Sequence, residues 1–153
     1  MFEVLKSYIS AASFIEFLIY MVTSGFLITL YTYVYTKITP HDEFDLIRKG
    51  NLSASIALGG AIIGFVLPMA SVISHSVGLI DYVIWALIAG VVQLFAFYIA
   101  GKIVPEIPAR IERNEFSAAA FVAIVAISVG LINAACMTPD TVSSSQTTSY
   151  QQG

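Results

Sequence analysis

The chain has 153 residues, of which 58% are apolar and only 11% are charged. Because soluble domains carry roughly 25% charged residues, this composition excludes a water-soluble globular protein. The net charge of −3 assigns no partner, since orientation in a membrane follows Lys and Arg, and no pattern indicates nucleic-acid binding. The single cysteine, Cys136, excludes an internal disulfide and a multi-cysteine metal site, and we expect it to be a small packing residue.

The charged residues are clustered, and they leave four apolar runs long enough to cross a bilayer. A hydrocarbon core of roughly 30 Å needs about 20 helical residues, and a helix satisfies its own backbone hydrogen bonds there. Residues 1–12 precede the first run and are expected to form an interfacial lead-in or an extension of that run. We therefore predict an all-α integral membrane protein with four transmembrane helices, at about 13–35, 52–73, 79–99 and 115–137.

Two short charged connectors join the first run to the second and the third to the fourth. In the first connector, Thr39 is expected to cap a helix, Pro40 fits its first position, and Gly50 ends it. Acidic residues precede basic ones, as the helix dipole favours, so we predict short amphipathic helices at the membrane surface. The predicted surface for a cytoplasmic partner consists of Asp42, Glu43, Arg48, Lys49, Arg110 and Arg113.

The second run carries a ridge of small residues that includes a G-x-x-x-G pair, Gly60 and Gly64. In lipid, where burying apolar side chains gives no special advantage, such ridges let helices approach closely. We expect helix packing at Gly59, Gly60, Gly64 and Pro68, and the alternative is a pore-lining or substrate-facing glycine.

Two amides lie within the apolar runs: Gln93 deep in the third and Asn133 in the last turns of the fourth. A polar residue inside the membrane is a functional hypothesis by default, yet an amide more often bonds a neighbouring helix. Both a helix-bonding role and a place in a hydrophilic path stay open. At the start of the third run, Asp81, Tyr82 and Trp85 are expected to be interface anchors.

The second half of the chain repeats the pattern of the first. A shift of 65 residues pairs the stretch 37–40 (Lys-Ile-Thr-Pro) with 102–105 (Lys-Ile-Val-Pro), and a shift of 64 pairs Ser53-Ala54 with Ser117-Ala118. We interpret this as a duplicated two-helix unit, which gives parallel repeats related by an axis along the membrane normal. The predicted units are a hairpin at 13–74, a hairpin at 75–138 and a disordered polar tail at 139–153.

The basic residues predict the orientation. Six of the seven Lys and Arg residues belong to the two connectors: Lys37, Arg48, Lys49, Lys102, Arg110 and Arg113. Because cytoplasmic loops carry an excess of Lys and Arg, both connectors are expected to face the cytoplasm and both termini the periplasm.

No assembled chemical site is visible in the sequence. The cluster from His41 to Asp45 could be interpreted as a metal site, but closed zinc sites use several His or Cys ligands. His75 and Asp81 flank the turn between the second and third runs without a nucleophile beside them. We therefore expect no catalytic residues, no metal, no cofactor and no enzymatic activity.

Several of these stretches are similar to one known family: 37–41, 59–68, Asp81-Tyr82 with Trp85, Gln93-Leu94, and 133–137. Together they resemble the YjfL-like family of bacterial inner-membrane proteins, the domain of unknown function 350, over about residues 14 to 138. The resemblance implies four helices in a bacterial inner membrane and no established activity. It also implies a link with envelope-stress proteins of the phage-shock type. Glu16 and the longer polar tail depart from the family pattern.

Two functions from different classes follow. The first is a non-enzymatic membrane anchor or scaffold, whose charged connectors present a surface to a peripheral cytoplasmic protein. The second is an oligomeric channel or small-solute transporter, which the parallel repeats, the small-residue faces and Gln93 suggest. In either case the partners are the lipid bilayer and further copies of the chain, as a homo-oligomer.

Overall fold

The computed structural model describes residues 11–40 and 42–137, which form six helices and no strand, as the predicted all-α class requires. The helices are α2 (Ala11–Ile38), α3 (Glu43–Arg48), α4 (Leu52–His75), α5 (Leu79–Ile103), α6 (Ile107–Glu112) and α7 (Phe116–Cys136). The lead-in predicted at 1–12 lies outside the described residues except for its last two, which belong to α2. The tail predicted at 139–153 lies wholly outside them.

Four of these helices are long and apolar enough to cross a membrane, which confirms the four predicted spans. They contain 28, 24, 25 and 21 residues, and at about 1.5 Å per residue each reaches roughly the 30 Å of a hydrocarbon core. α2 and α5 continue three or four residues past their predicted ends. Lys37 and Lys102 belong to these extra turns, and the side chain of each reaches back about one helical turn to a tyrosine ring. The Lys37 ammonium lies 5.5 Å from the ring centroid of Tyr33, and the Lys102 ammonium lies 5.4 Å from that of Tyr98.

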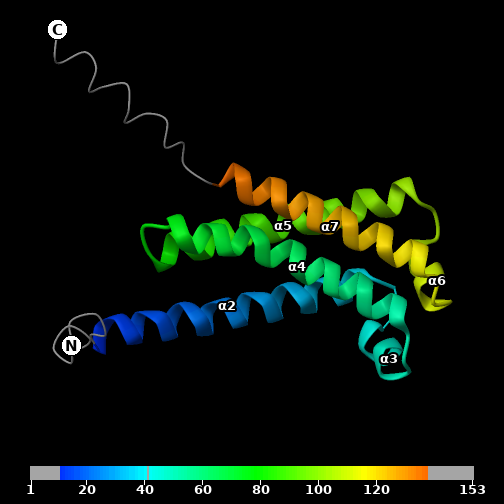
Figure 1. The fold of residues 1–153 in the computed structure, drawn as a ribbon, viewed down its shortest axis with the longest axis horizontal. Coiled ribbons are helices and arrows are strands. Elements are labelled where there is room, and N and C mark those ends of the chain that lie inside the picture. The colour runs from blue at the N-terminus through cyan, green and yellow to red at the C-terminus, as the bar shows by residue number, and fades with distance from the viewer. Residues whose placement is uncertain (1–10, 41, 138–153) are drawn as a thin grey trace, which may run out of the picture.

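The long helices place both connectors at the same end of the molecule (Figure 1). α4 and α7 run side by side in the same direction, and α3 and α6 lie together where these two helices begin. The start of α2, the α4–α5 turn and the end of α7 lie at the opposite end. We call these the connector end and the distal end. The order of one long, one short and one long helix occurs twice along the chain, and the duplication itself stays a prediction.

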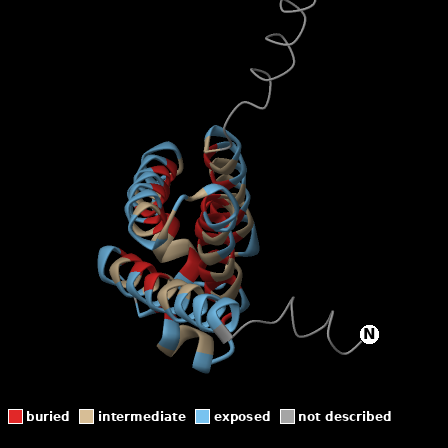
Figure 2. Cartoon of the chain, turned by 90° about the vertical axis from the view of Figure 1, so that its left-hand side faces the viewer, coloured by how far each residue is buried: buried red, intermediate tan, exposed pale blue. Residues whose placement is uncertain are grey.

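α2 is the most peripheral of the long helices. Only one stripe of it is buried, Leu27, Tyr31 and Tyr35, and Tyr31 stacks on Phe65 of α4 with ring centroids 4.4 Å apart. Figure 2 shows the buried positions gathered between the helices and the exposed ones on their outward faces. The outward face of α2 carries large apolar side chains, as a surface in contact with lipid does.

A hydroxyl pair ties α2 to α5. Tyr82 is fully buried, and its hydroxyl lies 2.7 Å from the hydroxyl of Ser24. The prediction of Tyr82 as an interface anchor is therefore wrong, because its ring packs inside the helix bundle, whereas Trp85 is 46% exposed.

Candidate functional site

The first connector helix begins later than predicted. Asp42, and not Thr39, caps α3, and its carboxylate accepts the backbone N–H of Asp45 at 3.1 Å. Thr39 instead extends the end of α2, since both its N–H and its hydroxyl donate to the carbonyl of Tyr35. Gly50 ends the helix as predicted, with a φ of +84° and an N–H that donates to Ile47 at 2.9 Å.

Asn51 joins the first connector to the second. Its side-chain oxygen accepts the N–H of Ala54 at 2.8 Å and so caps α4. Its amide nitrogen donates to the carbonyls of Ile111 and Glu112, at 2.9 Å and 3.2 Å, which are among the last carbonyls of α6. One buried side chain thus satisfies the start of α4 and the end of α6.

Asn114 makes the reciprocal bond from the second connector. It has a φ of +59°, a left-handed conformation that asparagine tolerates well, and it follows Arg113, the C-cap of α6. Its side-chain oxygen accepts the N–H of Ser53 at 3.0 Å, in the first turn of α4. The second connector is therefore fastened to the first connector through Asn51 and to the first turn of α4 through Asn114, and we call residues 42–51 and 106–115 the connector platform.

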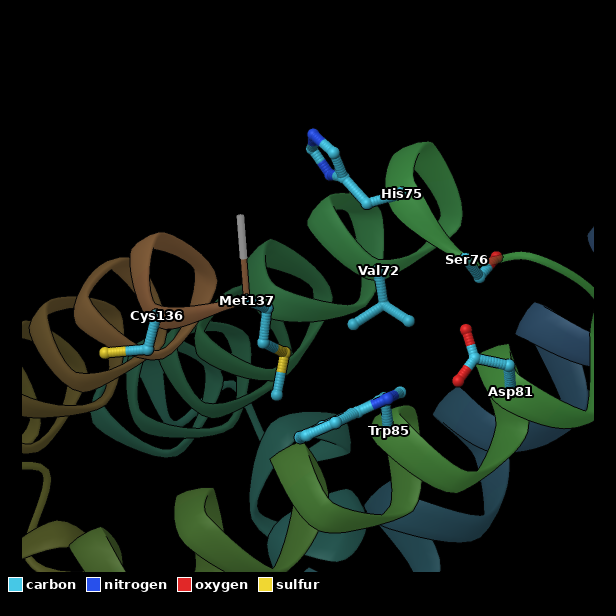
Figure 3. A pocket seen from close by; sticks show the side chains of 7 residues that line it. All are labelled: Val72, His75, Ser76, Asp81, Trp85, Cys136 and Met137. Carbon is cyan, nitrogen blue, oxygen red and sulfur yellow. The ribbon is translucent and has the colours of Figure 1, made fainter. Parts of the chain in front are cut away.

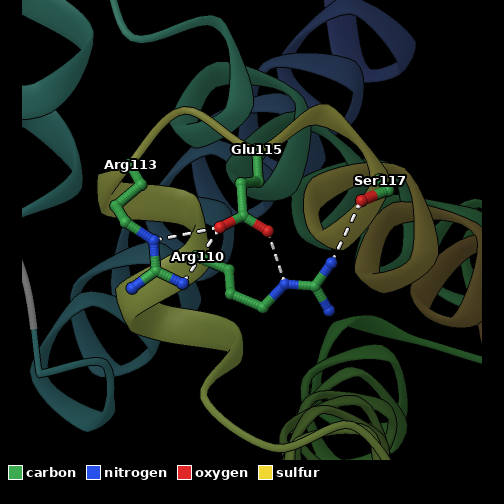
Figure 4. A network of polar contacts seen from close by, with 4 residues as sticks. All are labelled: Arg110, Arg113, Glu115 and Ser117. Carbon is green, nitrogen blue, oxygen red and sulfur yellow. Dashed lines mark hydrogen bonds and ion pairs between the residues drawn. The ribbon is translucent and has the colours of Figure 1, made fainter.

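Glu115 holds two arginines of the platform in place (Figure 4). Its carboxylate lies 2.6 Å from Arg110 Nε and 2.9 Å from Arg113 Nη2, and Arg110 also donates to the Ser117 hydroxyl at 3.2 Å. The hydrogen bonds from Arg110 and then Arg113 lower the pKa of the Glu115 carboxyl. Glu115 was predicted as the first residue of the fourth span, and it is instead the residue that precedes α7.

The predicted partner surface is only partly accessible. Asp42, Arg48, Lys49 and Arg113 are exposed and Arg110 is half-buried. Glu43 is only 1% exposed, so its assignment to this surface is wrong. It lies one helical turn before Ile47, which packs against the core, and the helix periodicity turns both side chains inward.

Two of the predicted packing glycines lie at the closest contact between α4 and α7. A Cβ at Gly60 would lie 2.5 Å from Ala123 Cα, and one at Gly64 would lie 2.7 Å from the carbonyl carbon of Ala126. Real Cβ atoms do not approach so closely, so these positions require glycine. Gly59 meets nothing within 4 Å, and its prediction as a packing residue is therefore wrong.

α7 also needs a glycine, Gly130, at its contact with the Gly64 backbone, four residues before Pro68. Pro68 is buried and has no N–H, so the carbonyl of Gly64, four residues earlier, lacks its usual helical donor. That carbonyl lies against Gly130 of α7, where a Cβ would come within 2.8 Å of Gly64 Cα. The close approach permits a weak Cα–H···O contact between the two helices. One turn further on, the Ser71 hydroxyl donates to the carbonyl of Ala134 at 3.0 Å.

Gln93 is the deepest polar side chain of this packed region, and it is 1% exposed. Its amide nitrogen donates to the carbonyl of Ala126 at 2.7 Å and so fastens α5 to α7, beside Gly64. Its side-chain oxygen and the amide nitrogen of Asn133 are buried and have no hydrogen-bond partner among the described residues. The sequence left two roles open for Gln93, a bond to a neighbouring helix or a place in a hydrophilic path. The structure shows the bond to a neighbouring helix.

Sequence reasoning missed the residues that join the two connectors. No bonding role was predicted for Asn51 or Asn114, and Glu115 was placed inside the fourth span. Asn51 follows a glycine and precedes an apolar run, which is the signature of an N-cap, and this signal could have identified its role toward α4. Its bonds to α6, which is 60 residues away, cannot be predicted from the sequence around Asn51.

Comparisons with known proteins agree on one family. The family model for the Domain of Unknown Function DUF350 matches residues 8–137. The chain is 34% identical over 126 residues to the UPF0719 inner membrane protein YjfL of Escherichia coli K12. That match covers 82% of this chain and 96% of YjfL. It is 30% identical over 123 residues to the UPF0719 transmembrane protein YshE of Bacillus subtilis 168. That match covers 76% of this chain and 87% of YshE. No solved structure matches this chain.

The matched residues include all four long helices, the connector platform and the Gly64–Gly130 contact. The sequence resemblance, the four apolar helices and both relatives point to the same conclusion. The chain belongs to the DUF350 family, the YjfL-like proteins, and it is a multi-pass protein of the bacterial inner membrane.

Proposed function

We propose that this protein is a non-enzymatic membrane anchor whose connector platform binds a peripheral cytoplasmic protein. One observation carries the proposal: Asn51 of the first connector bonds the second connector about 60 residues away, and Asn114 of the second connector bonds the start of α4. A pre-organised surface loses less conformational entropy when a partner binds, which supports a docking role.

The charges of the platform support the same proposal. Arg48 is exposed and makes no ion pair with any described residue, and Lys49 pairs only with Asp45 on its own helix. These side chains keep their charge available to a partner. The excess of Lys and Arg at this end favours the cytoplasmic side, where a peripheral protein would meet it. As part of the same proposal, we infer that the partner is a stress-response protein, from the link with envelope stress that the sequence resemblance implies.

The test is affinity purification of the tagged full-length chain from native membranes in mild detergent. The double variant Arg48→Glu with Lys49→Glu reverses two exposed charges, and Arg48→Lys with Lys49→Arg is the matched control that keeps them. Because like-charge contacts cost several kcal/mol, we expect the reversed variant to recover the partner at least about tenfold less well than wild type. Glu43 is left unchanged because it is buried, and Asp42 because it caps α3.

The control should recover the same soluble protein as wild type. Equal recovery from wild type, control and reversed variant would remove the platform as the binding surface. Thermal melts of wild type and of both variants establish that all three proteins are folded. We expect this because the side chains of Arg48 and Lys49 are exposed.

The second candidate is an oligomeric channel or small-solute transporter, and the unpartnered amide atoms of Gln93 and Asn133 favour it. The close contacts at Gly60 and Gly64 leave no room for a path between α4 and α7 at those positions, so a path lined by the two buried amides would lie elsewhere within the bundle. Flux into liposomes should then fall in the variants Gln93→Leu and Asn133→Leu. Wild-type liposomes without flux, or variants with unchanged flux, would eliminate this candidate.

A further inference from the structure

A pocket of about 260 Å³ lies at the distal end, between the end of α4, the start of α5 and the end of α7. Figure 3 shows that the carboxylate of Asp81, the ring of Trp85 and the side chains of Val72 and Met137 surround this space. The imidazole of His75 and the thiol of Cys136 point away from it. Cys136 is exposed, so its prediction as a packing residue is wrong.

The polar groups of this pocket are held in place and have hydrogen-bonding capacity left. One oxygen of Asp81 accepts the backbone N–H of Val77 at 3.2 Å, which orients the carboxylate. A carboxylate offers about four lone-pair positions, so most of its capacity remains. The buried hydroxyl of Ser76 has no hydrogen-bond partner among the described residues. Both groups can accept the N–H donors of a ligand.

Among residues 11–40 and 42–137, no lysine or arginine lies at the distal end, because each is on the platform or in the last turns of α2 and α5. The basic side chain that lines this pocket is His75, whose imidazole points away from Asp81 (Figure 3). No lysine or arginine of the described residues therefore neighbours the Asp81 carboxylate. A ligand cation would supply the missing charge, and the face of Trp85 attracts cations as well.

We propose that this distal pocket binds an organic ammonium group. An ammonium offers three N–H donors, which match the Asp81 carboxylate and the Ser76 hydroxyl, while a short alkyl stem fits Val72 and Met137. A divalent metal ion fits less well, because it requires six or more oxygen ligands and these walls are largely apolar. The ammonium can come from the headgroup of phosphatidylethanolamine or from a small amine in solution.

The single tryptophan of the chain reports on this pocket directly. The full-length protein is placed in nanodiscs of phosphatidylglycerol, which has no ammonium group, and Trp85 emission is followed during titration with ethanolamine. A second series replaces a rising fraction of the lipid with phosphatidylethanolamine. We expect a saturable change in emission, and in the variant Asp81→Asn a midpoint at least about tenfold higher, since a hydrogen bond to a charged carboxylate is stronger than one to a neutral amide.

The variant Asp81→Asn can still accept the N–H of Val77, so the turn is preserved. The matched control is Glu16→Gln, which removes the other described acidic side chain near this end and should respond like wild type. A response to free ethanolamine identifies a soluble amine, and a response only to phosphatidylethanolamine identifies a lipid. The proposal is wrong if wild type responds to neither, if Asp81→Asn responds like wild type, or if Glu16→Gln loses the response equally.

Discussion

Replacing Gly64 by alanine should lower the free energy of unfolding by about 1–3 kcal/mol, whereas the same change at Gly59 should raise it by roughly 0.4–1 kcal/mol. A Cβ at Gly64 would collide with the amide of Gln93 and with the backbone of Ala126. A backbone obstacle cannot rotate away, so α4 and α7 would have to separate. At Gly59 a Cβ meets nothing within 4 Å, and alanine is the better helix former.

The two glycines lie five residues apart on one helix, so each variant is the matched control of the other. Thermal or denaturant unfolding of the full-length chain in one detergent, followed by circular dichroism, gives the comparison. The variant Gly130→Ala should behave like Gly64→Ala, because its Cβ would meet the backbone of Gly64. If Gly64→Ala were as stable as Gly59→Ala, the close α4–α7 contact would be refuted.

The sequence predicted the long helices because length and apolar composition alone decide which segments cross a bilayer. It also predicted the roles of Gly60 and Gly64, since a G-x-x-x-G pair places both residues on one helix face. Gly59 precedes Gly60 by one residue and therefore points about 100° away, which the periodicity of a helix could have excluded. The need for glycine at Gly130 follows from the backbone of Gly64 on another helix, and no local pattern contains it.

The candidate sites were harder to predict, because their geometry depends on contacts between distant segments. Asn51 and Ile111 are 60 residues apart, so no local pattern shows that they are bonded. The burial of Glu43 depends on how α3 lies against the core, and a helix of six residues has too weak a period to decide it. Asp81 and Trp85 are four residues apart on α5, but Met137 is the residue that follows α7.

Thiol labelling should show which side of the membrane each connector faces. The chain has a single cysteine, so each introduced thiol can be followed by itself once that cysteine is replaced. Cys136 is exposed at the end of α7, at the distal end, so a thiol reagent can reach it in the unaltered protein. Arg48 and Arg113 are exposed at the connector end. In a background with Cys136→Ser, the changes Arg48→Cys and Arg113→Cys each introduce one thiol per connector without a buried contact being lost.

Labelling of these three cysteines in intact spheroplasts with a membrane-impermeant maleimide tests the central claim most directly, namely that both connectors share the cytoplasmic side. We expect Cys136 to be labelled without permeabilisation, and the thiols of the Arg48→Cys and Arg113→Cys variants to be labelled only after the membrane is opened. Labelling of the two introduced thiols from opposite sides of the membrane, or of both from outside, would contradict the account.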